Sequence, residues 1–150
     1  MLGEGESIMA RRVLCIDDDP LLLPITTKAL EQHGFEVTAA SGNDEALAHL
    51  ERDPKGFDVV IQDSQRPLGR CLADAGAPEE LHELSGVLFL RRHIWRLNPR
   101  LPCIFVTMTP RSFIFHQGPA LEGNPRFRYL MKPSPPDELS AVVQEILAEA

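Results

Sequence analysis

Residues 13–20 read VLCIDDDP, in which four apolar residues run directly into three aspartates and a proline. A short apolar run with β-branched members that stops at polar residues is typical of a buried strand. Asp19 followed by Pro20 is typical of a helix start, because aspartate caps the first turn and proline suits the first helical position. This stretch therefore predicts a strand and then a helix that ends near Gly34. Pro24 would clash within the first turn, so we expect that helix to start late or to kink.

The same alternation of strand and helix patterns continues along the chain. Strands are expected at residues 12–16, 35–40, 57–61, 102–107 and 127–131. Helices are expected after Ser41, where Asp44 resembles the acid of a capping box, over residues 88–97 and from about Ser134. The helical signal between residues 110 and 125 is poor. Strands that each lead into a helix form parallel sheets with right-handed crossovers. We therefore expect an α/β fold, a doubly wound five-stranded parallel sheet of the flavodoxin-like order 2-1-3-4-5 with helices on both faces.

Composition narrows the class of protein. The 150 residues suit one domain, and 43% apolar and 25% charged residues are ordinary for a soluble globular protein. No apolar run approaches the roughly 20 residues that a membrane span needs, and residues 1–11 lack the features of a secretory signal. The net charge of −7 disfavours direct nucleic-acid binding, and three widely spaced cysteines suggest neither a disulfide framework nor a zinc site. We expect a cytoplasmic protein that binds neither membrane nor nucleic acid directly, with a flexible leader over residues 1–11 and one domain over residues 12–150.

Reactive side chains stand at the ends of four expected strands. Asp17–Asp19 follow the first strand, Asp63 follows the third, Thr107 ends the fourth and Lys132 follows the fifth. Ligands of doubly wound sheets bind beyond the carboxyl ends of the strands, where neighbouring strands are only about 4.8 Å apart. Carboxylates brought that close repel one another unless a cation joins them, and oxygen ligands of this kind suit Mg²⁺. A cation site with a hydroxyl and an ammonium group is the chemistry of phosphoryl transfer.

The motifs that hold these residues resemble the receiver domains of two-component response regulators. VLCIDDDP is similar to the family's acidic first-strand motif, and FDVVIQDSQRP to the motif in which the phosphoacceptor, here Asp63, is followed four residues later by Pro67. PCIFVT carries the switch hydroxyl as Thr107, and YLMKP carries Lys132 with the aromatic switch position at Tyr129. Each motif is weak alone, but four of them in order at strand ends are specific. In the family the hydroxyl and the amine hold phosphoryl oxygens, which implies that role for Thr107 and Lys132.

The resemblance implies a chemistry and a set of partners. Asp63 would take a phosphoryl group from a phosphohistidine on a sensor histidine kinase or a histidine phosphotransfer protein. Asp18, Asp63 and the backbone carbonyl of Gln65 would bind Mg²⁺, and Asp17 would act mainly through water. The signal would pass to a downstream protein target or through self-association. We expect no enzyme activity beyond slow self-dephosphorylation. Since the chain ends after its last helix, we expect a single-domain regulator or a fragment of a longer protein.

The chain departs from the family pattern after the phosphoacceptor. The family has a glycine about eight residues after that aspartate, and here Gly86 takes its place, which implies roughly fifteen extra residues. We place this insertion at residues 68–85. The most structure expected there is a short amphipathic helix with Leu81 and Leu84 on one side. Arg66 stands where the family usually has methionine.

Two other functions are alternatives to a phosphoacceptor receiver. A haloacid-dehalogenase-like phosphohydrolase also uses an aspartate nucleophile with Mg²⁺, but its D-x-D-x-[TV] signature does not match DDDPL at residues 17–21. A degenerate receiver would keep the fold and act as an interaction module without phosphorylation. The insertion and Met108, where the family prefers Ala or Gly, favour this reading. The retained Asp63, Thr107 and Lys132 oppose it. Read singly, Asp17–Asp19 could be helix caps and Tyr129 a half-buried strand aromatic.

Overall fold

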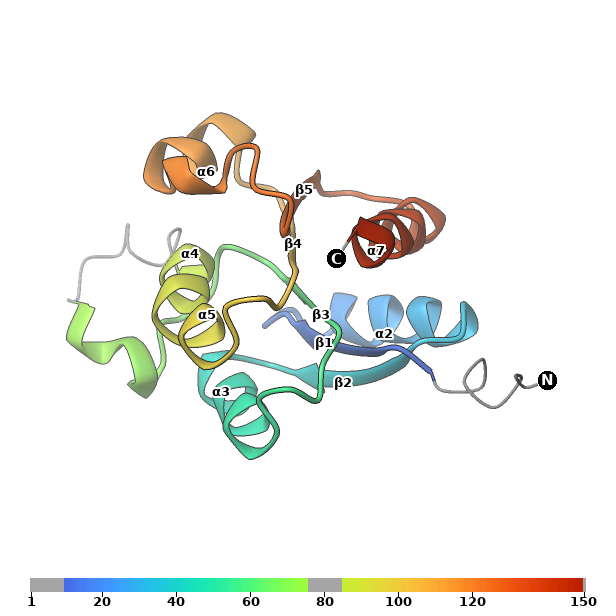
Figure 1. Cartoon of the computed structure of the whole chain (residues 1–150), viewed down its shortest axis with the longest axis horizontal. Helices are drawn as coiled ribbons and strands as arrows, with labels where there is room; N and C mark the ends of the chain where they lie inside the picture. The colour runs from blue at the N-terminus through green and yellow to red at the C-terminus, as the bar shows by residue number, and fades with distance from the viewer. Residues whose placement is uncertain (1–9, 76–84, 150) are drawn as a thin grey trace.

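The computed structural model describes residues 10–75 and 85–149, and at its centre lies a parallel sheet of five strands (Figure 1). The strands are β1 (Arg12–Ile16), β2 (Glu36–Ala40), β3 (Val59–Gln62), β4 (Cys103–Thr107) and β5 (Phe127–Met131). They lie in the order β2-β1-β3-β4-β5, and every neighbouring pair is parallel. This order confirms the predicted doubly wound sheet.

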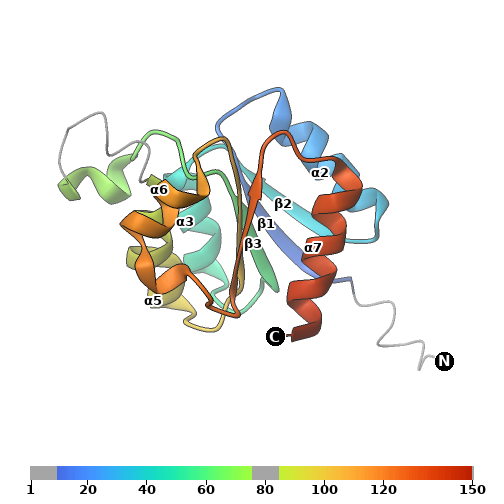
Figure 2. The same cartoon turned by 90° about the horizontal axis from the view of Figure 1, so that it is seen from above.

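Helices cover both faces of the sheet, as Figure 2 shows. One face is covered by α2 (Leu22–Gln32) and α7 (Pro136–Glu149). The opposite face is covered by α3 (Asn43–Arg52), α4 (Ser85–Phe89), α5 (Trp95–Leu97) and α6 (Arg111–Gln117). A π-helical stretch at Leu90–Ile94 joins α4 to α5 without a break.

The two faces explain why β1 is continuously apolar. Val13 and Cys15 pack in the cluster beneath α2 and α7, whereas Leu14 and Ile16 pack in the cluster on the opposite face. All four side chains are buried, because a central parallel strand has helices above and below it. The sheet edge beyond these strands is therefore the place where polar side chains can reach solvent.

The first helix follows its local signals. It begins at Leu22, as the late start predicted from Pro24 requires. Asp19 caps it, since one carboxylate oxygen accepts the N–H groups of Leu21 at 2.9 Å and Leu22 at 3.2 Å. After the helix, Gly34 has a φ of 91°, a left-handed conformation that glycine adopts without steric cost.

The capping box expected after Ser41 does not form, because no side chain caps α3 and Ser41 pairs with a different acid from the one predicted. The N–H and the hydroxyl of Ser41 both donate to Glu45, at 2.7 and 3.0 Å. Asp44 instead accepts the N–H groups of Arg70 and Cys71, both at 2.9 Å. These two hydrogen bonds lower the pKa of Asp44 and anchor the segment that follows β3. Donors from a distant loop thus take the carboxylate that the local pattern assigned to the helix.

Two segments contain more structure than their sequence signals predict. Arg70–Ala75 forms a 3-10 helix, and its Leu72 is fully buried in the core. The helix expected over residues 78–84, with Leu81 and Leu84, lies outside the described residues. In the stretch with a poor helical signal, α6 forms because Ile114 is fully buried against the sheet. The helix expected from residue 88 already begins with α4 at Ser85.

Candidate functional site

Three of the predicted site residues meet at the carboxyl edge of the sheet. Asp17 directly follows β1, Asp63 follows β3 and Lys132 follows β5. The Lys132 Nζ lies 3.0 Å from Asp17 Oδ2 and 2.8 Å from Asp63 Oδ2. The N–H of Asp63 donates to the carbonyl of Ile16 at 3.3 Å, which aligns the ends of β1 and β3. Parallel strand ends thus bring together residues that are 69 and 115 positions apart in the chain.

The electrostatics of the site depend on this lysine. Burial lowers the pKa of Lys132, but the hydrogen bond and the charge of Asp63, and then those of Asp17, outweigh burial and leave that pKa above its usual value. The lysine is therefore charged at neutral pH. Burial, followed by the charge of Asp17, raises the pKa of Asp18. Negative charge is thus concentrated here beyond what one lysine neutralises.

Backbone amides fix the orientation of the two carboxylates that touch the lysine. Asp63 Oδ1 accepts the N–H of Gln65 at 3.0 Å, and Asp17 Oδ1 accepts the N–H of Asp19 at 3.0 Å. Each carboxylate therefore has one oxygen on a backbone amide and the other on Lys132. The Asp63 side chain is 13% exposed, so it is largely buried but still reaches solvent.

The oxygen donors at this edge suit a small hard cation. Within residues 10–75 and 85–149, no group of three or more His, Cys, Asp or Glu side chains is arranged to hold a metal ion. Mg²⁺ needs only one or two carboxylates when waters and a phosphoryl oxygen complete its shell. The residues present therefore fit Mg²⁺, provided that not all three of Asp17, Asp18 and Asp63 are direct ligands.

Thr107 is fully buried and its hydroxyl belongs to a small cluster that sequence reasoning missed. Its Oγ1 lies 2.8 Å from the hydroxyl of Ser64 and accepts the N–H of Thr109 at 3.1 Å. Ser64 also donates to the hydroxyl of Thr109 at 3.0 Å. Ser64 immediately follows Asp63, so this cluster links the end of β4 to the residue beside the phosphoacceptor candidate. The only sequence signal was that Ser64 lies inside one of the motifs and that Thr109 closely follows another.

Tyr129 lies half-buried at the other side of the same cluster. Its hydroxyl donates to the carbonyl of Thr109, and burial raises its pKa. The guanidinium of Arg111 lies 5.1 Å from the centre of its ring, within the range of a cation–π contact. Tyr129 therefore contacts the loop after β4 rather than Asp63 or Lys132 themselves.

Arg66, noted in the sequence only as a departure from the family, is buried beneath the phosphoacceptor candidate. Its side chain donates to the carbonyl of Asp63, to Gln62 Oε1 at 2.5 Å and to Asn43 Oδ1 at 2.6 Å. Burial lowers the pKa of Arg66 to about 10, so the guanidinium keeps its charge at neutral pH. The sequence offers no signal for this burial, because a lone arginine in a loop is usually exposed.

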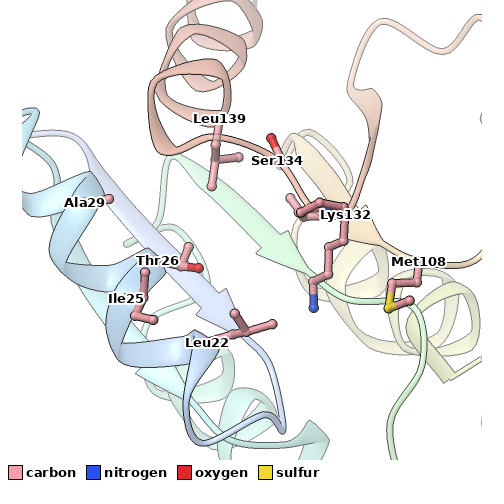
Figure 3. Close-up of a pocket in the computed structure, with 10 residues that line it drawn as sticks. Leu22, Ile25, Thr26, Ala29, Met108, Lys132, Ser134 and Leu139 are labelled. Atoms are coloured by element: carbon pink, nitrogen blue, oxygen red, sulfur yellow. The ribbon is translucent and has the colours of Figure 1, made fainter.

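An apolar groove borders the site. Side chains of α2 face the segment from Lys132 to Leu139 across a volume of about 300 Å³ (Figure 3). We call this the α2 groove; its lining is Leu22, Ile25, Thr26, Ala29, Val106, Met108, Lys132, Pro133, Ser134 and Leu139. Two large apolar side chains of this lining are exposed, Ile25 at 58% and Met108 at 72%. The groove is therefore an apolar surface continuous with the lysine of the site.

No known family model matches the chain. The two-component response regulator ARR11 of Arabidopsis thaliana is 41% identical over 67 residues, which are 45% of this chain and 13% of that protein. The sensor protein GacS of Pseudomonas syringae pv. syringae is 38% identical over 66 residues, 44% of this chain and 7% of that protein. A crystal structure of a response regulator receiver domain protein from Clostridium thermocellum superposes with a TM-score of 0.72 and 28% identity, covering 92% of this chain and 94% of that one.

These similarities agree with the resemblance drawn from the four motifs. The chain spans only a small part of the curated relatives, but it spans nearly all of the solved receiver domain. In the described part of the chain, every helix is too short or too polar to cross a bilayer.

Proposed function

We propose that this chain, which is a receiver domain of the two-component type, is a phosphoacceptor with Asp63 as its nucleophile. The observation that carries the proposal is the position of Lys132, whose Nζ is 2.8 Å from Asp63 and 3.0 Å from Asp17. The ammonium group of Lys132 can exchange its contacts with the carboxylates for contacts with an incoming phosphoryl group and stay in the site. Positioning and charge neutralisation supply most of the catalysis in such transfers.

In the proposed step a carboxylate oxygen of Asp63 attacks the phosphorus of a phosphohistidine on the donor protein. An oxygen–phosphorus bond forms as the phosphorus–nitrogen bond breaks, and its electron pair stays on the imidazole nitrogen. The Gln65 N–H, 3.0 Å from Asp63 Oδ1, holds the carboxylate in place. Asp18, Asp63 and the carbonyl of Gln65 would hold Mg²⁺, with Asp17 acting through water, and the ion would supply charge neutralisation for the transferred group.

The hydroxyl cluster is the proposed switch. In the resting chain Thr107 contacts Ser64 at 2.8 Å. After phosphorylation Thr107 would exchange this partner for a phosphoryl oxygen. Thr109 would then lose its hydrogen bonds with the hydroxyls of Thr107 and Ser64. The carbonyl of Thr109 is the acceptor of the Tyr129 hydroxyl. Movement of Tyr129 would then carry the signal to a downstream protein or a second copy of the chain.

The α2 groove is the proposed contact surface for the phosphodonor, a sensor histidine kinase or a histidine phosphotransfer protein. Lys132 lines the groove and also contacts Asp63, so a partner that presents phosphohistidine to Asp63 could also rest on Met108 and α2. One relative is named a sensor protein, which supports a kinase as the partner. We further propose a cytoplasmic location, no direct contact with nucleic acid or membrane, and no substrate turnover beyond slow loss of the phosphoryl group.

The proposal is tested with acetyl phosphate and Mg²⁺, with intact mass as the readout. The native chain should gain one phosphoryl group, and Asp63→Asn should gain none. Asp74→Asn is the matched control, because Asp74 is 80% exposed and pairs with Arg92. Equal labelling of the Asp63 variant would refute the assignment. Failure of the native chain to react with acetyl phosphate and with phosphohistidine donors would favour a phosphorylation-independent module, and turnover of a generic phosphate ester would favour a phosphohydrolase.

A further inference from the structure

The loop after β3 contains a buried cation directly beneath the site. The Arg66 side chain is 2% exposed, and each of its three guanidinium nitrogens donates to an uncharged oxygen. These acceptors are the carbonyl of Asp63 and the side-chain amide oxygens of Gln62 and Asn43. The guanidinium also lies 5.5 Å from the centre of the Phe89 ring. The hydrogen bonds compensate part of the desolvation, but none of these partners neutralises the charge.

Asn43 extends the network from its own helix to two neighbouring segments. Its amide nitrogen donates to the carbonyl of Leu68 at 3.1 Å and to the hydroxyl of Ser85 at 2.9 Å. Ser85 is the first residue of α4, and Asn43 is the first residue of α3. Arg66 and Asn43 together therefore tie the backbone of Asp63 to the amino ends of two helices.

The unneutralised charge acts on the site above it. The negative charges that interact with the guanidinium include those of Asp63, Asp18 and Asp17. In a buried environment such interactions are screened far less than at the surface. Phosphorylation would convert the carboxylate of Asp63, with one negative charge, into an acyl phosphate with about one and a half to two negative charges at neutral pH, a net gain of about one-half to one unit. Binding of Mg²⁺ would add two positive charges to the same place.

We propose, on the basis of the proposed phosphoacceptor function, that Arg66 is a positioning residue whose buried charge favours the phosphorylated form of Asp63 and opposes binding of Mg²⁺ to the unphosphorylated site. A positive charge attracts an added anion and repels an added cation, so these two effects have opposite signs. A residue that only held the loop in place would affect both ligands in the same direction. The combination of opposite signs therefore separates a charge effect from a structural one.

The experiment measures two dissociation constants in the full chain by NMR titration, one for Mg²⁺ alone and one for beryllofluoride at saturating Mg²⁺. Beryllofluoride serves as the phosphoryl mimic. Arg66→Met should bind Mg²⁺ about threefold to tenfold more tightly and beryllofluoride about threefold to tenfold more weakly, as expected for one charge acting across a partly solvated site. Arg66→Lys keeps a positive charge but loses the three-way hydrogen bonding of the guanidinium, so both constants should lie closer to those of the native chain than the constants of Arg66→Met do.

The control variant is Arg100→Met, which removes an exposed arginine in the turn before β4, at the opposite edge of the sheet. It should change neither constant. Weaker binding of both ligands by Arg66→Met, no change in either, or a lysine variant that behaves like the methionine variant would overturn the inference. If Arg66→Met does not fold, Arg66→Gln supplies the uncharged comparison, and failure of both to fold assigns Arg66 to folding alone and overturns it too.

Different results would refute the phosphoacceptor function and the role of Arg66. A native chain that binds no beryllofluoride and accepts no phosphoryl group would refute the phosphoacceptor function itself. A native chain that does both, with variants that shift both constants in the same direction, would refute only the role of Arg66.

Discussion

Substitution of Gly86 by alanine tests how α4 packs beneath the site. The residue lies in the first turn of the helix, and its N–H donates to the carbonyl of Ser64 at 2.9 Å. A Cβ at this position would lie 2.7 Å from the Cα of Ser64 and 2.9 Å from the carbonyl oxygen of Asp63. Both contacts are with backbone atoms, which cannot rotate away as a side chain can. The helix would have to move away from the segment that carries Asp63.

Helix propensity and packing predict opposite signs for this variant. Within a helix, alanine is favoured over glycine by about 1 kcal/mol. Overpacking of this kind costs about 1–3 kcal/mol, and contact with rigid backbone places it at the upper end of that range. We therefore expect Gly86→Ala to lower the free energy of unfolding by about 1–2 kcal/mol, which corresponds to a fall in Tm of about 2–8 °C for a chain of this size.

The free energy is measured by urea unfolding, with fluorescence of Trp95, the only tryptophan, as the probe. Gly42→Ala is the matched control. Gly42 has an extended φ of −171°, and a Cβ there would meet nothing within 4 Å, so its change should stay within about 0.5 kcal/mol. A Gly86 variant as stable as the native chain, or more stable, would show that helix propensity outweighs the contact and would refute the packing argument.

Two further variants probe the charge of the site and the segment after β3. Asp18→Asn should raise the Tm without Mg²⁺ by about 1–3 °C, a small gain because Asp18 is largely exposed and only partly desolvated, and should reduce the Tm increase that Mg²⁺ produces. The reason is that partial burial and the charge of Asp17 raise the pKa of Asp18, so ionised Asp18 destabilises the fold above that pKa. The Tm gain of the variant should vanish as the pH falls toward 3.8, the ordinary pKa of aspartate, because native Asp18 is then protonated as well. An equal Mg²⁺ response in the two chains would contradict this account. Leu72→Ala should cost about 2–4 kcal/mol in urea unfolding, because Leu72 is fully buried, whereas Leu21→Ala, at a side chain 76% exposed, should cost little; similar losses for both would place Leu72 outside the core.

The buried Leu72 also changes what is expected of the insertion predicted at residues 68–85. From sequence alone its replacement by a short turn should cost little, since the entropy of loop closure grows only logarithmically with length. Such a replacement of residues 68–86 would remove Leu68 and Leu72 from the core and Gly86 from its contact with Ser64. We now expect it to destabilise the fold, which a thermal melt of the shortened chain checks.

The sequence by itself determined the architecture and the identity of the residues at the strand ends. The three central strands β1, β3 and β4 are short, mainly apolar runs, and a parallel sheet buried on both faces produces that pattern directly, whereas the edge strands β2 and β5 also contain polar residues. VLCIDDDP is the clearest case, since its run ends where β1 ends, at Ile16, and its acids begin where the sheet edge begins. Because all five strands are parallel, knowing their ends was enough to expect Asp63 and Lys132 at one edge, although their roles stay proposals.

Only the tertiary structure decided which partners these residues have. Asp44 bonds to Arg70 and Cys71, 26 and 27 positions away, and Thr107 meets Ser64 across 43 positions. Arg66 lies beneath Asp63 because Asn43, 23 positions earlier, provides an acceptor in the interior. The physical reason is that such contacts depend on how loops and helix ends approach one another in space, and propensity and periodicity describe only neighbours within a few residues of each other along the chain.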